Sequence, residues 1–282
     1  MRKISLIWSL LLCFGSVWAQ FEVPTADVIK VFFKTKTCFI IDDNPFSEVN
    51  IQLKSAAQKF WELTPFEFIS VDEFEKRKKS STYSFVSVDD VYFDSDKNST
   101  KYKFLCVYLG GNFKTESNML QLCTIPLAYS EQEENEYAYK IGTLLILAQN
   151  HIELVKNNPN LKKSNIIDYY NNNNKGKLQN KTLYLKANEV DKKINNQTAF
   201  KQLYPYSFKF VSQDDIEKAI DEKASDVVFL HKVGPGKKHG YHTYEIFLGT
   251  ADATIYYYDY HTVDENNPDV LLEKEVKKMV KQ

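Results

Sequence analysis

The sequence lacks the short motifs that mark several common active sites. No Gly-x-Ser-x-Gly, His-Glu-x-x-His or Cys-x-x-Cys pattern occurs, so no nucleophile elbow, zinc-binding helix or dithiol motif is identified. An excess of one charge sign is also lacking, since 36 Lys and Arg stand against 37 Asp and Glu. Nucleic-acid-binding domains are usually strongly basic, and a net charge of −1 therefore argues against a nucleic-acid partner. The glycine-containing run at 234–240 lacks the phosphate-loop pattern and predicts a hairpin turn.

Cysteine is scarce, and its spacing fits no zinc or redox pattern. Cys13 lies in an N-terminal apolar stretch, and Cys38, Cys106 and Cys123 lie in the remainder. In an oxidising compartment, three cysteines allow either one disulfide with one buried thiol or three buried thiols, and the pairing stays open. All three have apolar neighbours in the sequence, which favours small core residues over reactive thiols. The sequence predicts no cofactor.

The first residues have the three zones of a secretory signal peptide. A basic start, Arg2 and Lys3, precedes an apolar stretch at 4–14, and small residues follow at Val17 and Ala19. This pattern predicts a signal peptide at 1–19 and export to the periplasm, the outer membrane or the medium. A membrane anchor is the alternative, but a spanning helix needs roughly 20 apolar residues. Lipidation at Cys13 is disfavoured because Leu12 is not small, although the sequence does not settle it.

No later apolar run approaches membrane-spanning length, so the mature chain is expected to have no transmembrane segment.

Two stretches of the chain, far apart in the sequence, resemble each other. Residues 57–76 align without gaps on 199–218, and eight of these 20 pairs are identical. The polar identities, such as Ser70/Ser212 and Asp72/Asp214, are not explained by a shared hydrophobic pattern alone. A tandem duplication therefore accounts best for the alignment.

Each copy predicts a β-α-β-α-β-β-β-α unit, and the fold class is α+β with two mixed sheets whose helices pack mainly on one face. The first two strands are joined through a helix and should pair in parallel, whereas the last three should form an antiparallel meander. The predicted organisation is a first α/β repeat domain at 20–165, an asparagine-rich linker at 166–181 and a second repeat domain at 182–282. Strands are expected at 37–42, 66–70, 83–88, 102–109 and 119–127, then at 182–186, 208–212, 226–230, 242–248 and 254–263.

Serines are expected to start a short helix in each copy. Ser70 and Ser212 each end an alternating strand and precede acidic residues, as at a helix N-cap. This capping role explains the duplicated acids at 72, 75, 214 and 217 better than catalysis does. Longer helices are expected at 46–63, 133–156, 188–203 and 269–280.

The segment PFEFISVDEFEK at Pro65–Lys76, its counterpart at Tyr206–Lys218 and the apolar strands that follow carry a family resemblance. With the signal peptide and the order of elements, the chain resembles the TolB amino-terminal-domain and CsgG-like group of bacterial envelope proteins. The resemblance covers roughly 37–127 and 182–263. It implies a non-enzymatic docking module, pore subunit or regulator of envelope machinery.

Four of the five histidines lie in the second half of the chain: His231, His239, His242 and His261. Strand ends and turns can bring such imidazoles together, which makes a Zn²⁺ or Cu²⁺ site geometrically possible. Solvated loop histidines are the alternative, because the first repeat has no matching residues.

The run Ile255–His261 is rich in tyrosine. Strict alternation would place Tyr256, Tyr258 and Tyr260 on one face of a strand, where they would form a binding surface. The alternative is a partly buried sheet face beneath the last helix.

Together these features predict an exported, non-enzymatic envelope protein that binds another protein or a polymer. The rival prediction is a metal-binding or hydrolytic periplasmic protein that uses the histidines of the second half.

The signal-peptide prediction is tested by exporting the full sequence and sequencing the N-terminus of the product. The mature chain should begin at Gln20, because Val17 and Ala19 occupy the small-residue positions of the cleavage site. Ala19→Arg should block the cleavage. A wild-type product that keeps residues 1–19 would contradict the prediction.

Overall fold

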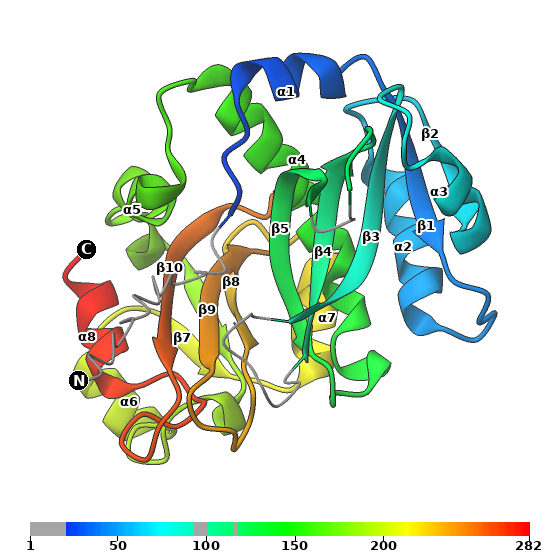
Figure 1. The fold of residues 1–282 in the computed structure, drawn as a ribbon. Coiled ribbons are helices and arrows are strands. Elements are labelled where there is room, and N and C mark those ends of the chain that lie inside the picture. The colour runs from blue at the N-terminus through cyan, green and yellow to red at the C-terminus, as the bar shows by residue number, and fades with distance from the viewer. Residues whose placement is uncertain (1–20, 93–100, 115–117) are drawn as a thin grey trace, which may run out of the picture.

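The computed structural model describes residues 21–92, 101–114 and 118–282 and shows two five-stranded mixed sheets with their helices (Figure 1). The expected signal peptide, including Cys13, lies outside the described residues. The α+β class and the two similar halves expected from the sequence are confirmed.

The first sheet has the strand order β2-β1-β3-β4-β5. Strand β1 pairs in parallel with β2 and β3, whereas the pairs β3/β4 and β4/β5 are antiparallel. The elements of this half are α1 (Ala26–Phe32), β1 (Lys36–Ile41), α2 (Glu48–Phe60), β2 (Phe66–Ser70), α3 (Val71–Arg77), β3 (Tyr83–Tyr92), β4 (Lys101–Leu109), β5 (Leu120–Tyr129) and α4 (Ile141–Asn157).

The second sheet repeats this topology strand for strand, in the order β7-β6-β8-β9-β10. Strand β6 is parallel to β7 and β8, and the pairs β8/β9 and β9/β10 are antiparallel. The elements are α5 (Ile166–Asn173), β6 (Thr182–Leu185), α6 (Gln197–Leu203), β7 (Phe208–Phe210), α7 (Gln213–Asp221), β8 (Val227–Val233), β9 (His242–Gly249), β10 (Ile255–Thr262) and α8 (Glu273–Val280). The parallel pair and the meander expected from the sequence are both present.

The two connecting helices of the first half lie on opposite faces of its sheet. Phe39 on β1 packs against Trp61, which ends α2, with ring centroids 5.3 Å apart. Its neighbour Cys38 points the other way, toward the side where Phe85 meets Phe74 of α3 at 4.9 Å. Helix α4 packs beside α2, so α3 alone covers part of the opposite face.

The serine caps occur as expected. Ser70 accepts a hydrogen bond from the backbone N–H of Glu73, and Ser212 accepts one from Asp215. The helix expected at 188–203 is shorter, because Asn196 caps a helix that begins only at Gln197. Similarly, α4 begins at Ile141 after two short 3₁₀ turns and not at 133.

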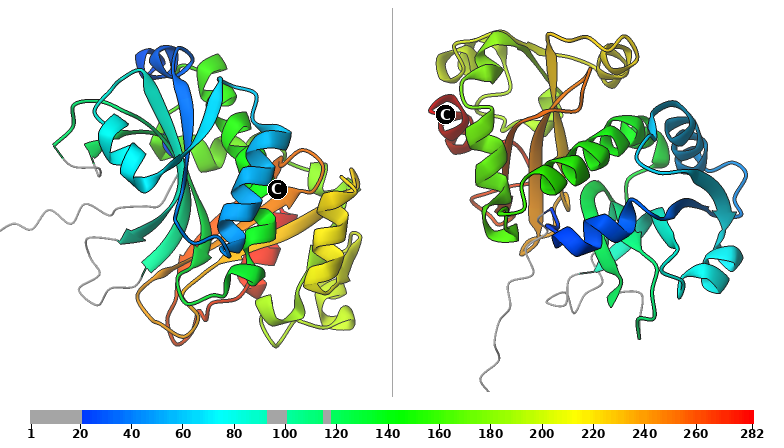
Figure 2. Two further views of the ribbon diagram at one scale, coloured as in Figure 1. Left: turned by 90° about the vertical axis from the view of Figure 1, so that its right-hand side faces the viewer. Right: turned by 90° about the horizontal axis from the view of Figure 1, so that it is seen from above.

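The second sheet is covered on both faces. Leu230 and Phe247 pack with α6 and α8 on one face. On the other face, Tyr244 and Ile246 join the core of the first half, where the rings of Tyr244 and Tyr102 lie 5.9 Å apart. Figure 2 shows α4 running between the α2 side of the first half and the second half. The two halves therefore share one continuous core.

The asparagine-rich connection, expected as a linker, is folded. It contains helix α5, which, like α1, precedes the first strand of its half. The Asn171 amide donates to the backbone carbonyl of Tyr258 at 2.9 Å and accepts from the backbone N–H of Tyr258 at 2.8 Å. Asn174 donates to the carbonyl of Ile255 at 2.7 Å. Because β10 is an outer strand, these amides satisfy backbone groups that no neighbouring strand reaches.

All three described cysteines are free and buried. Of the two arrangements left open by the sequence, three buried thiols is therefore the one found. Among the described residues, no helix combines the length and the apolar character needed to cross a bilayer.

The hydrogen bonds from Asn171 to β10 give a stability prediction. Asn171→Ala removes two hydrogen bonds to a buried stretch of backbone, so the free energy of unfolding should fall by about 2 kcal/mol. Urea denaturation measures this change. Asn173→Ala is the control, because Asn173 is exposed in the same run and should change little. Equal stability of the two variants would show that the hydrogen bonds of Asn171 do not hold α5 on the sheet.

Candidate metal centre

A cluster of three metal-ligating side chains lies where α8 begins beneath the second sheet. Strand β9 supplies Glu245, β10 supplies His261 and α8 supplies Glu275. In the β9/β10 ladder Glu245 faces Asp259 and His261 faces Thr243, so Glu245 and His261 project from the same face of the sheet. Glu275 occupies the third helical position, and its Oε2 accepts a hydrogen bond from the backbone N–H of Leu272 at 2.7 Å.

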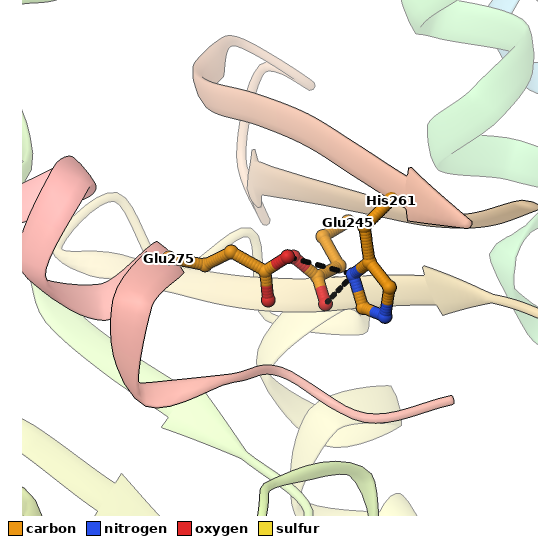
Figure 3. Close-up of side chains that lie close together, drawn as sticks. All are labelled: Glu245, His261 and Glu275. Atoms are coloured by element: carbon orange, nitrogen blue, oxygen red, sulfur yellow. Dashed lines mark ion pairs between the residues drawn. The ribbon is translucent and has the colours of Figure 1, made fainter. Parts of the chain in front are cut away.

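The ligand atoms of the three residues lie within 4.8 Å of one another (Figure 3). His261 Nδ1 is 2.6 Å from Glu275 Oε1 and 3.9 Å from Glu245 Oε1. Two ligands of one zinc ion lie roughly 3–4 Å apart, because each bond is about 2.0–2.2 Å long. The cluster thus fits one small cation, provided that Glu275 Oε1 moves outward by a few tenths of an ångström.

Glu245 is the unusual member of the cluster. Its side chain is 0% exposed, and neither carboxylate oxygen has a hydrogen-bond partner. Burial, and next the neighbouring Glu275, raise the pKa of Glu245 well above its usual range. A buried carboxyl group without a partner destabilises a fold by about 1–3 kcal/mol or more, and a cation at this position would remove that penalty.

A lysine faces Glu245 across the strands but bonds elsewhere. Lys232 is the ladder partner of Glu245 on β8, yet its Nζ lies 2.6 Å from Asp269 Oδ1. At the equivalent ladder position of the first half, Asp90 faces Lys103, and the two form an ion pair at 3.0 Å. The acid and the lysine of this cross-strand pair have changed places between the halves. In the first half they bond to each other, whereas in the second half the lysine bonds to Asp269 and leaves Glu245 without an ion-pair partner on the neighbouring strand.

The backbone fixes the orientation and the tautomer of His261. Its Nε2 lies 3.0 Å from the carbonyl oxygen of Pro268, which can only accept, so Nε2 carries a hydrogen. In a neutral ring the Nδ1 lone pair then points at the Glu275 carboxylate, which is unfavourable unless a positive charge lies between them. A carbonyl that orients a histidine through its other nitrogen is also typical of metal sites.

A second buried polar atom lies on this face. The Thr243 hydroxyl, directly across the ladder from His261, is buried and has no hydrogen-bond partner. A water molecule that completes the coordination of an ion could use it.

The four histidines singled out from the sequence do not come together. His231 projects from the opposite face of the sheet, where its Nε2 donates to the carbonyl of Pro126 in the first half at 2.8 Å. His239 is exposed in the turn before β9. His242 faces Tyr260, with rings 5.6 Å apart. Only His261 belongs to the one candidate ligand group found in the part of the chain that the structure describes.

The tyrosine strand does not alternate as expected. A shift in the β9/β10 register between Ile255 and Tyr257 puts Tyr256 with Tyr257 in the cluster under α8, whereas Tyr258 joins the core shared with the first half. The exposed fractions are 9% for Tyr256 and 1% for Tyr258, and Tyr260 is partly buried. This is closer to the alternative of a buried sheet face than to an open surface, and binding through these tyrosines stays a prediction.

Sequence reasoning missed Glu245 and Glu275. Glu245 had one usable signal, a single acid within the otherwise apolar and aromatic run Tyr244–Leu248. Such a residue faces inward when both sides of the strand are covered. Glu275 had none, because an acid near a helix start usually serves as a cap.

Comparison with known protein families, with curated proteins and with solved structures finds no match to this chain.

His231 predicts a pH dependence of stability. Burial, and next the nearby Lys140, lower the pKa of His231 to about 3, against about 6.5 in an unfolded chain. The unfolded state therefore binds the additional proton as the pH falls below 6.5, and the folded state loses stability. Between pH 6.5 and 4.5 this loss should be about 2–3 kcal/mol.

Urea denaturation at several pH values measures the effect. In His231→Gln the free energy of unfolding should depend less steeply on pH, by the slope that corresponds to about one proton. This change in slope is expected whatever the substitution does to stability at neutral pH. His239→Gln should leave the slope unchanged, since that ring is exposed. Parallel profiles for the wild type and His231→Gln would contradict the assignment.

Proposed function

We propose that the protein binds one divalent transition-metal ion at Glu245, His261 and Glu275, and that the ion has a structural role. The observation that carries the proposal is the Glu245 carboxylate, which is fully buried, without a hydrogen-bond partner and within 3.9 Å of an imidazole nitrogen. Imidazole with two carboxylates is a ligand set that suits Zn²⁺.

Protons are the competing occupants of the cluster. A proton on Nδ1 would satisfy His261 and Glu275, which lie 2.6 Å apart. Glu245 would then have to be neutral, and its hydroxyl would donate to the Glu275 carboxylate. A metal ion instead satisfies the imidazole and both carboxylates in their charged form, and for this reason the metal is preferred.

The burial of the ligands favours a structural ion over a catalytic one. The side chains of His261 and Glu275 are 9% and 5% exposed, and Glu245 is not exposed at all. A catalytic zinc keeps a position that substrate can reach. An ion here would instead tie α8 to β9 and β10, and so hold the last helix on its sheet.

Export to the envelope and docking of another protein or polymer remain part of the proposal. They are supported by the signal-peptide pattern and the family resemblance. Strands β2 and β7 form the outer edges of the two sheets away from the shared core, and they are the places where an added strand would pair.

The metal site is tested by elemental analysis and thermal unfolding of the mature chain, purified without chelator from zinc-supplemented medium. The wild type should carry about one equivalent of zinc, and Glu245→Gln should carry little. At free zinc 100 times above the dissociation constant, the ion should add about 3 kcal/mol to the stability of the wild type. EDTA should therefore lower the melting temperature of the wild type and not that of Glu245→Gln.

Glu273→Gln provides the matched control, because Glu273 lies on the same helix but pairs with Lys277 at the surface. It should keep both the metal and the response to EDTA. If the wild type carries no stoichiometric metal and Glu245→Gln raises its stability, the cluster is a protonated carboxyl pair and the proposal fails.

A further inference from the structure

A cavity of about 760 Å³ opens in the first half, where the parallel strands β1 and β2 end. Its wall includes Asp42 after β1 and Val71 after β2. The volume is in the range of pockets that hold small organic molecules.

The topology explains why the chain leaves an opening here. It runs from β1 to α2 on one face of the sheet and from β2 to α3 on the other face. When neighbouring parallel strands lead to opposite faces, a crevice forms at their carboxyl ends, and ligands of open α/β sheets bind in such crevices.

The opening also depends on two small side chains. When the ungapped alignment of the two copies is continued, Ser87 and Cys106 in the wall of the cavity correspond to Phe229 and Leu248. In the second copy these two larger side chains are fully buried in the core shared with the first half. The first copy has less side-chain volume at both positions, and all residues that line its cavity lie between 40 and 121. The space that the second copy fills is therefore left for a ligand in the first.

The four acids in the wall of the cavity already have partners within the protein. Glu75 pairs with Lys78 at 2.6 Å, Asp90 pairs with Lys103 at 3.0 Å, and Asp42 accepts a hydrogen bond from the Asn50 side chain at 2.8 Å. Asp89 is engaged as well. A charged ligand would have to break one of these pairs or remain unpaired, and an unpaired charge is costly in a partly apolar site. The wall thus favours a ligand without charge.

Aromatic and apolar side chains form much of the remaining wall. The rings of Phe74 and Tyr108 lie 6.3 Å apart, edge to face, and the Tyr108 hydroxyl has a hydrogen bond with the Ser87 hydroxyl at 3.1 Å. Val71 also lines the cavity and is 45% exposed, so apolar surface is in contact with solvent there. A ligand that covers this surface removes it from water, which favours binding.

We propose that this cavity binds a small uncharged molecule with aromatic rings. The ligand is held by the burial of its apolar surface and by ring contacts with Phe74 and Tyr108. The proposal does not depend on the metal site, whose ligands all belong to the second half.

The test uses two fluorescent probes with the same aromatic rings, N-phenyl-1-naphthylamine, which is uncharged, and 1-anilinonaphthalene-8-sulfonate, which adds one sulfonate. Both are titrated into the mature chain at pH 7. The uncharged probe should bind saturably with one site per chain, and its affinity should not fall as salt is added. The sulfonate should bind at least tenfold more weakly. Equal affinities, or no saturable binding of the uncharged probe, would overturn the proposal.

Substitutions in the wall place the binding within the cavity. Val71→Asp puts a carboxylate in the first turn of α3, where the helix dipole favours it, and should weaken the uncharged probe at least fivefold. Val31→Asp is the matched control, because Val31 is exposed to a similar extent, 41%, on α1 and does not line the cavity. If both variants lower the affinity equally, or neither does, the cavity assignment fails.

A second variant fills the cavity from within. Cys106→Leu introduces the side chain that the second copy has at this position, and it should also weaken the uncharged probe at least fivefold. Circular dichroism and urea denaturation check that the variant is folded. If folded Cys106→Leu binds the probe as tightly as the wild type does, the probe lies elsewhere and the proposal is wrong.

Discussion

The structure depends on one constraint: the second sheet is covered on both faces. The first half packs against one face, and α6 and α8 pack against the other. Side chains of β8 and β9 that would meet solvent in an open sheet are therefore buried, whatever their polarity. Polar groups there are cut off from solvent: His231 and Lys232 find partners within the protein, whereas the Glu245 carboxylate has no hydrogen-bond partner.

The duplication shows how two copies of one backbone diverged. Both retain the same strand order, the same directions and the same serine caps. They differ in what covers the second face of each sheet, opposite α2 and α4 in the first copy and opposite α6 and α8 in the second. In the second copy this face became the interface with the first, and apolar residues line it. In the first copy α3 covers part of this face, and the rest borders a cavity whose wall includes Ser87, Asp89 and Cys106. A cross-strand ion pair was exchanged in sign between the copies, which left a carboxylate inside the second sheet.

The sequence predicted correctly the features that depend on interactions between residues close together in the chain. The alternation of Phe66–Ser70, the hydroxyl of each cap and the spacing of the repeat fixed the topology, because those signals act within a few residues. Helix α5 was missed since its asparagines are poor helix formers, and they are used there for bonds to β10, far along the chain. The bulge near Tyr256 was missed because one inserted residue changes the face of a side chain without altering composition. The metal cluster was missed in part because its members meet only through the β9/β10 register and the docking of α8.

The hydrogen bonds of Asn171 and Asn174 to the backbone of β10 have a consequence for self-association. An outer strand with free backbone groups can template cross-β growth, and here that strand is occupied by amides of its own chain. At the other end of the sheet, β7 has only three residues, which is a short template. Of the two outer strands away from the shared core, β2 is the longer template, and there Glu67 is held by Lys36 and Arg77 and places a charged network beside an incoming strand.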